Sequence, residues 1–142
     1  IALVAVGFSR KSQADFETWI PAFKKRYKEN PKIVVLEIPM MGPTFKWVRA
    51  MIEKGIRKGI PEENHDSVML FYGDVEPYRT YYRWSEKYKS YMMLVDHNGR
   101  VIWQTGGASN AEQLRELFEK TDRAIHVKST HSSKEAIKEI DS

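Results

Sequence analysis

The sequence predicts a three-layer α/β domain, in which a central mixed sheet has helices on both faces. Apolar runs of strand length alternate with segments of helical periodicity along most of the chain, which is the pattern of α/β proteins. An Asn98-Gly99 pair between two apolar runs indicates a tight hairpin, because both central residues of such a turn adopt positive φ. At 142 residues, the chain is long enough to bury one substantial core.

The first third of the chain predicts a strand, a helix and a second strand. Residues 1–8 form a continuous apolar run, which suits a strand buried on both faces. Ser12-x-x-Asp15 has the spacing of a capping box, so we expect a helix to begin there and to be kinked at Pro21. Residues 32–38 predict another buried strand. The apolar stripe of the expected helix consists of Phe16, Trp19, Ile20, Phe23 and Tyr27.

The middle region predicts a helix, a short strand and a further helix. Residues 67–73 have the length and apolar content of a short strand. Residues 76–88 begin with Pro77 at an early helical position and predict a helix. The preceding helix is expected over residues 44–58, with one face made of Phe45, Val48, Ile52 and Ile56.

The last third predicts a hairpin followed by a helix. Residues 91–95 form a buried strand, and residues 100–105 pair back with it through the tight turn. Ser109-x-x-Glu112 is expected to open the last core helix, whose inward side chains are Leu114, Leu117 and Phe118.

The domain organisation follows from a change of composition near residue 121. Residues 1–121 are expected to form the folded domain. Residues 122–142 are polar and are expected to form a C-terminal tail that docks loosely or not at all. No apolar run approaches the ~20 residues that cross a bilayer. The chain starts without a methionine, so we expect that a targeting segment or anchor could have preceded it.

The composition excludes several chemistries. The chain contains no cysteine, which removes disulfides, thiolate nucleophiles, cysteine-ligated zinc and iron–sulfur clusters. The net charge of +4 favours acidic partners, but 23 basic against 19 acidic residues is a moderate excess. The acidic loop 62–66 lacks metal-ligand spacing, so we predict no metal site and no cofactor.

The order of the predicted elements is the thioredoxin-type arrangement. The second half resembles the peroxiredoxin-like branch through "SVMLFYGD" and "YMMLVDHNGRVIWQTGG". The first strand and helix align with thioredoxin without a gap, from "VGF" to the proline inside the helix. The proline that precedes the third core strand of thioredoxins is missing, since Lys89-Ser90 stands before Tyr91. In this alignment the CxxC positions are occupied by Gln13, Ala14, Asp15 and Phe16, none of which forms a thiolate.

Three stretches carry a closer resemblance: "FSRKSQADFETWIPAF", "GIPEENH" and "YMMLVDHNGRVIWQTGGASNAEQL". With them the chain resembles the mitochondrial F-type ATP synthase assembly factors called factor ten. The resemblance implies a redox-inactive, non-enzymatic binding protein on the matrix side of the inner membrane. It also implies a chaperone role, with a membrane subunit of the ATP synthase as protein partner. Without the resemblance, a cytoplasmic protein would be expected.

The loop before the first helix is a candidate anion site. Amides at a helix N-terminus and a positive dipole end attract anions. Simple capping of the helix, with solvated basic side chains, is the alternative that we favour. The candidate residues are Ser9, Arg10, Lys11 and Ser12.

Two further surfaces are candidates for binding. Aromatic and basic residues alternate over residues 78–91 and suit a protein partner, with single-stranded RNA as the less favoured ligand. The structural alternative is that the tyrosines simply belong to the core and its rim. The residues of this predicted partner surface are Tyr78, Arg79, Tyr82, Arg83, Trp84 and Tyr88. A basic face on the middle helix is either solvated or, if the resemblance holds, in contact with anionic lipid; it comprises Lys46, Arg49, Lys54, Arg57 and Lys58.

Three functions therefore remain open from the sequence. The first is an assembly factor for a membrane complex. The second is a structural subunit of a large assembly such as an organellar ribosome, held through RNA and protein contacts. The third is a binder of a small anion or ligand at the Ser9–Ser12 loop.

Overall fold

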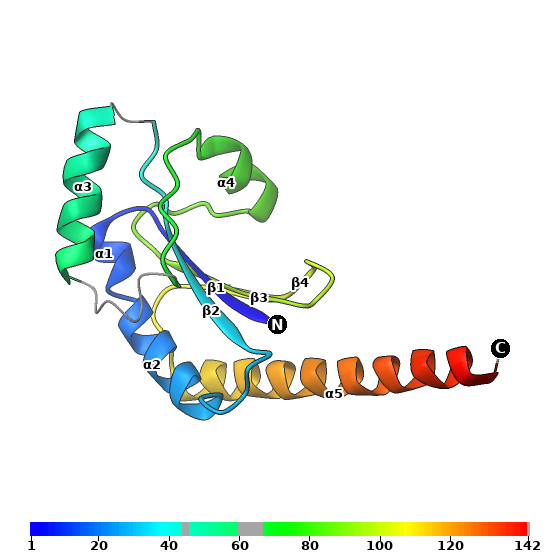
Figure 1. The fold of residues 1–142 in the computed structure, drawn as a ribbon. Coiled ribbons are helices and arrows are strands. Elements are labelled where there is room, and N and C mark those ends of the chain that lie inside the picture. Colours follow the sequence, from blue (N-terminus) through cyan, green and yellow to red (C-terminus); the bar gives the residue numbers. More distant parts are fainter. Residues whose placement is uncertain (44–45, 60–66, 142) are drawn as a thin grey trace.

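A four-stranded mixed sheet forms the centre of the protein in the computed structural model, which describes residues 1–43, 46–59 and 67–141 (Figure 1). Side chains of the last helix are described as far as residue 126. The strand order is β2-β1-β3-β4, with β1 parallel to β2 and antiparallel to β3, and with β4 antiparallel to β3. This confirms the predicted α/β fold. The strands are β1 (Ala2–Gly7), β2 (Val34–Pro39), β3 (Tyr91–Val95) and β4 (Val101–Gly106).

Helices cover the two faces of the sheet unequally. One face packs against α2 (Phe16–Arg26) and the first half of α5 (Ala111–Asp141). The other face is covered by α4 (Glu76–Tyr82) and the segment after it. The short α1 (Arg10–Gln13) follows β1, and α3 (Lys46–Gly59) stands at the side of the molecule (Figure 1). In the described residues, no helix is long and apolar enough to cross a membrane.

The larger core lies between the sheet and the α2–α5 pair. Trp19 of α2 is fully buried and meets Trp103 of β4 edge to face, with ring centroids 5.7 Å apart. The indole N–H of Trp19 donates to the carbonyl of Gly107 at 2.8 Å, so the polar end of this side chain is satisfied. Leu117 of α5 is also fully buried. Burying a side chain of this size contributes about 1.5–3 kcal/mol.

The predicted start of the first helix is wrong by one turn. Ser9, and not Ser12, is the N-cap, and it begins α1 through a capping box in which Ser12 is the reciprocal partner. Asp15 precedes α2 but makes no side-chain cap bond to it. Two serines three residues apart can satisfy each other, which leaves the carboxylate of Asp15 available for a tertiary contact.

The start of the last helix also differs from the prediction. The Oδ1 of Asn110 accepts from the backbone N–H of Gln113 at 2.8 Å, so Asn110 takes the capping role expected of Ser109. The hydroxyl of Ser109 instead donates to the carbonyl of Thr18 in α2 at 2.6 Å. The residue therefore joins the two helices to each other.

The expected strand at residues 67–73 is replaced by two isolated bridges, which pair Val68 with Glu37 of β2 and Phe71 with Met40 just after β2. The N–H of Phe71 donates to the carbonyl of Pro39 at 3.0 Å. Pro39 lies between the two bridges and has no N–H, so it cannot supply the hydrogen bond that would connect them into one ladder.

The helix expected over residues 76–88 ends at Tyr82. Arg83 adopts the left-handed conformation with φ of 60°, which stops the helix. Arg79 then binds the chain that leaves the helix, since its Nε donates to the carbonyl of Trp84 at 3.1 Å and its Nη2 to that of Ser85 at 3.0 Å. The turn carries Trp84 into the core, where it is 2% exposed.

The last helix continues past the predicted domain boundary. Residues 122–141 extend α5 without a break, and Figure 1 shows this part of the helix running away from the sheet. The division into a domain over residues 1–121 and a tail over 122–142 therefore has no counterpart in the secondary structure. It remains a prediction.

A polar network joins the C-terminal end of α2 to α5. Arg26 and Asp122 form an ion pair of 2.9 Å, and the hydroxyl of Tyr27 donates to the same carboxylate at 2.8 Å. Burial, followed by the hydrogen bond to Asp122, raises the pKa of Tyr27 to about 12. The neutral phenol is therefore the form that the folded state stabilises.

The network predicts a loss of stability at alkaline pH. An unfolded tyrosine loses its proton near pH ~10, whereas folded Tyr27 keeps it to about 12. Between these values the unfolded state binds fewer protons, so the free energy of unfolding falls as the pH rises. Urea unfolding over this interval should show the advantage of wild type over Tyr27→Phe shrinking with pH. A constant difference would contradict this assignment.

Candidate functional site

The four positions that hold CxxC in thioredoxins lie in the connection between β1 and α2, against the start of β3. Gln13 ends α1, and Ala14 and Asp15 connect it to Phe16, the first residue of α2. Phe16 is 5% exposed and belongs to the core beneath the sheet. The position of a second cysteine is therefore filled by a packed aromatic ring.

The carboxylate of Asp15 closes this region. Its Oδ2 accepts from the backbone N–H of Ser90 at 3.2 Å and from the Ser90 hydroxyl at 3.1 Å. The carbonyl of Ser90 in turn accepts from the N–H of Gly107 at 2.9 Å. Ser90 is fully buried, and both of its backbone polar groups are bonded within the chain. An extended peptide cannot pair with Ser90 unless these bonds break.

The groups gathered here offer hydroxyl, amide and carboxylate oxygens but no thiolate. Disulfide exchange begins with attack by a thiolate, so these residues cannot perform it. In the part of the chain that the structure describes, no three histidine, aspartate or glutamate side chains lie together as metal ligands. The acidic loop 62–66 lies outside the described residues.

The backbone amides of the Ser9–Ser12 loop form hydrogen bonds within the loop itself. The N–H groups of Phe8 and Ser9 both donate to Ser12 Oγ at 2.8 Å, and the N–H of Ser12 donates to Ser9 Oγ at 3.2 Å. Ser12 is fully buried, while Arg10 and Lys11 are exposed. These hydrogen bonds are the ones expected if the serines cap the helix. Anion binding at this loop stays a prediction that the geometry does not support.

The predicted partner surface loses two members. Trp84 is buried between the rings of Tyr82 and Tyr91, at centroid distances of 4.8 and 5.9 Å. Arg79 has a side chain that is 16% exposed and holds the helix end. Both residues are structural because the helix stops at Tyr82, which the pattern of residues did not reveal.

A smaller aromatic surface remains on α4. It exposes Tyr78 (43%) and Tyr81 (80%) beside half-buried Tyr82 and exposed Arg83. The sequence prediction omitted Tyr81, although its position three residues after Tyr78 places both on one helix face. We call Tyr78, Tyr81, Tyr82 and Arg83 the aromatic surface. Tyr88, 56% exposed, is outside α4, and the ammonium group of Lys11 lies over its ring at 5.8 Å from the centroid.

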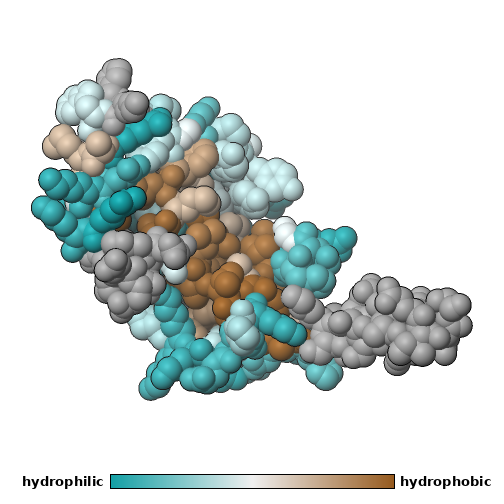
Figure 2. Space-filling view, viewed as in Figure 1, coloured by the Kyte–Doolittle hydropathy of each residue, from teal (hydrophilic) through white to brown (hydrophobic). Residues whose placement is uncertain are grey.

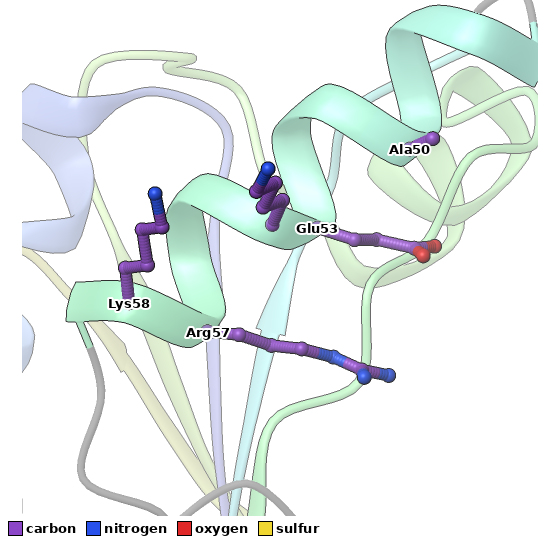
Figure 3. A pocket seen from close by; sticks show the side chains of 5 residues that line it. Ala50, Glu53, Arg57 and Lys58 are labelled. Atoms are coloured by element: carbon purple, nitrogen blue, oxygen red, sulfur yellow. The ribbon is translucent and has the colours of Figure 1, made fainter.

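The predicted basic face of α3 is divided between two sides of the helix. Arg49 is turned inward over the ring of Tyr72 at 4.7 Å, beside Glu53, whose carboxylate lies 3.4 Å from the Tyr72 hydroxyl. The side chain of Lys46 is outside the described part. The remaining basic residues are exposed and line a shallow hollow of about 400 Å³ (Figure 3); they are Lys54, Arg57 and Lys58.

An apolar groove beside the edge strand β2 is a feature that the sequence did not predict. Val34 is 54% exposed there, and Figure 2 shows apolar residues gathered across the middle of the molecule. The groove encloses about 660 Å³ and is lined by Phe23, Tyr27, Ile33, Val34, Val35 and Leu36 among others. Because β2 is the edge strand of the sheet, no further strand covers the side chains on this edge.

The sheet, its two helical layers and the cysteine-free closure by Asp15 define a thioredoxin-like protein that lacks the thiol pair. A crystal structure assigned as the thiol:disulfide interchange protein DsbE from Chlorobium tepidum is similar to it, with a TM-score of 0.53 and 16% sequence identity, over 87% of this chain and 78% of that one. At that identity the likeness concerns the fold.

The family model described as "ATP10 protein" matches residues 1–123, and the chain belongs to this family. Membership confirms the resemblance to factor ten, and it gives the chain a role in ATP synthase assembly and a mitochondrial setting. No curated protein matches the chain.

The closure by Asp15 predicts a measurable loss of stability on substitution. Asp15→Ala should lower the free energy of unfolding by about 1–3 kcal/mol, because it leaves the buried N–H and hydroxyl of Ser90 without their acceptor. Glu29→Ala removes an exposed charge of the same sign and should change it by less than about 0.5 kcal/mol.

A double-mutant cycle, measured by urea unfolding, separates the energy of the Asp15–Ser90 interaction from the other effects of each substitution. Asp15→Ala and Ser90→Ala should show a coupling of about 0.5 kcal/mol or more. Additive effects of the two substitutions would mean that the bond from the Ser90 hydroxyl contributes nothing, since Ser90→Ala keeps the backbone N–H that also donates to Asp15.

Proposed function

We propose that the protein is a non-enzymatic assembly factor, which acts as a chaperone for a membrane subunit of the F-type ATP synthase on the matrix side of the inner membrane. The observation that supports it most is the closed Asp15–Ser90 contact in a chain without cysteine. The similar structure is assigned as a thiol:disulfide interchange protein. In the present chain, the residues at the CxxC positions instead form structural hydrogen bonds, as Asp15 does with Ser90. Function then has to reside in surfaces, since the fold by itself specifies none.

The aromatic surface is suited to a protein partner. Tyrosine buries a large area at a low cost in side-chain entropy, and tyrosine and arginine are enriched at interface hot spots. Tyr81 presents its ring to solvent and rests edge-on against Tyr82 at 4.8 Å. Tyr82 stacks in turn on buried Trp84, so the surface is held from below by the core.

A crosslinking experiment identifies the partner. A photoreactive phenylalanine analogue replaces Tyr81 in the chain, which is expressed in mitochondria and irradiated. The expected adduct contains a membrane subunit of the ATP synthase. Adducts with RNA or ribosomal proteins would contradict the proposal and favour the structural-subunit alternative.

Variants of the same surface test its contribution. Tyr78→Ala/Tyr81→Ala should reduce recovery of the ATP synthase subunit about tenfold or more, because hot-spot tyrosines cost over about 1 kcal/mol each on truncation. Tyr88→Ala is the matched control, since it removes an exposed tyrosine that is not part of α4. Equal recovery with all three proteins would show that the client binds elsewhere.

A further inference from the structure

The outer side of α3 carries an unusual stripe of side chains. Trp47 and Met51 are each 68% exposed, and Lys54 and Lys58 are exposed as well. These residues stand at positions i, i+4, i+7 and i+11, so they share one face of the helix. We call them the outer stripe.

The inner side of α3 is occupied by a different set. Arg49 and Glu53 contact Tyr72, and the expected apolar face is half-buried at Val48, Ile52 and Ile56. Glu53 is the acidic residue of the helix sequence; its carboxylate is turned toward Tyr72, and it also borders the hollow that Lys54 and Lys58 line. The outer stripe therefore combines two large apolar side chains with two ammonium groups and contains no carboxylate.

We infer that the outer stripe docks the protein on an anionic phospholipid surface. Tryptophan favours the headgroup level of a bilayer, an apolar side chain beside it enters the acyl boundary, and lysines are attracted to anionic headgroups. Lysine is depleted at the core of protein–protein interfaces. A protein partner that covered Trp47 would also have to cover the lysines on the same helix face. The inference goes beyond the proposed function, because it concerns lipid and holds for any client.

The intrinsic fluorescence of the protein reports this contact. Of its four tryptophans, Trp19, Trp84 and Trp103 are buried, so a change at the surface is a change at Trp47. Vesicles containing phosphatidylcholine and phosphatidylglycerol should shift the emission to the blue and protect it from acrylamide quenching. Vesicles of phosphatidylcholine alone should do neither at the same lipid concentration, and added salt should weaken the effect.

Co-sedimentation with the same vesicles tests the individual residues. Trp47→Ala and Lys54→Glu/Lys58→Glu should each lower the partition coefficient about tenfold. Two matched controls should bind as wild type does: Tyr81→Ala, which removes an exposed ring, and Lys25→Glu/Lys28→Glu, which makes the same change of charge at the end of α2. Circular dichroism establishes that each variant keeps its helices.

Three results would overturn the inference. One is the absence of binding to anionic vesicles. Another is an equal loss with Lys25→Glu/Lys28→Glu, which would reduce the effect to net charge. The third is binding of a single-stranded RNA oligomer that competes with the vesicles and depends on the same residues, which would make the outer stripe a nucleic-acid surface.

Discussion

The hydrogen bonds from Ser90 to the carboxylate of Asp15 hold the beginning of α2 against the beginning of β3. They lie between segments 75 residues apart in the chain, at the place where the two halves of the fold meet. The core beneath the sheet depends on this register, because Phe16 and Trp19 follow Asp15 and pack there against β1 and β3. A buried serine with both backbone groups bonded leaves little freedom at a position where a catalytic groove would need to open.

The aromatic surface and the outer stripe depend on how α4 and α3 are arranged around the Asp15–Ser90 contact. α4 is stopped after Tyr82 by the left-handed Arg83, and the turn buries Trp84 beneath the exposed tyrosines. α3 contacts the segment beside β2 through its inner side, which leaves Trp47 in solvent. The groove lies beside the edge strand β2 on the α2 side of the sheet, whereas the protruding aromatic groups are carried by α4 and α3. These features suit a protein whose role is to bind.

Most of the architecture could be predicted because apolar periodicity and a tight Asn98-Gly99 turn are local signals. The parts that could not be predicted depend on competition between partners. Ser9 and Ser12 satisfy each other, so Asp15 is released from the capping role that its spacing indicated. Pro39 interrupts the ladder with residues 67–73, an effect that appears only once the facing strand is known.

The candidate sites were harder to predict than the fold, because exposure is a tertiary property. Residue type alone placed Trp84 and Arg79 on the partner surface and omitted Tyr81. Trp47 was likewise missed, since an aromatic residue in a helix of this periodicity usually faces a core. The absence of cysteine, by contrast, can be seen directly in the sequence, and it removes the thiolate with which disulfide exchange begins.

The most direct test of a role in assembly without thiol chemistry is made in mitochondria that lack their own family member. The cysteine-free chain is targeted to them, and the amount of assembled ATP synthase is measured on native gels. The account predicts that assembly is restored. If the chain accumulates folded while assembly stays absent, and a thiol-containing relative restores it, the account is contradicted.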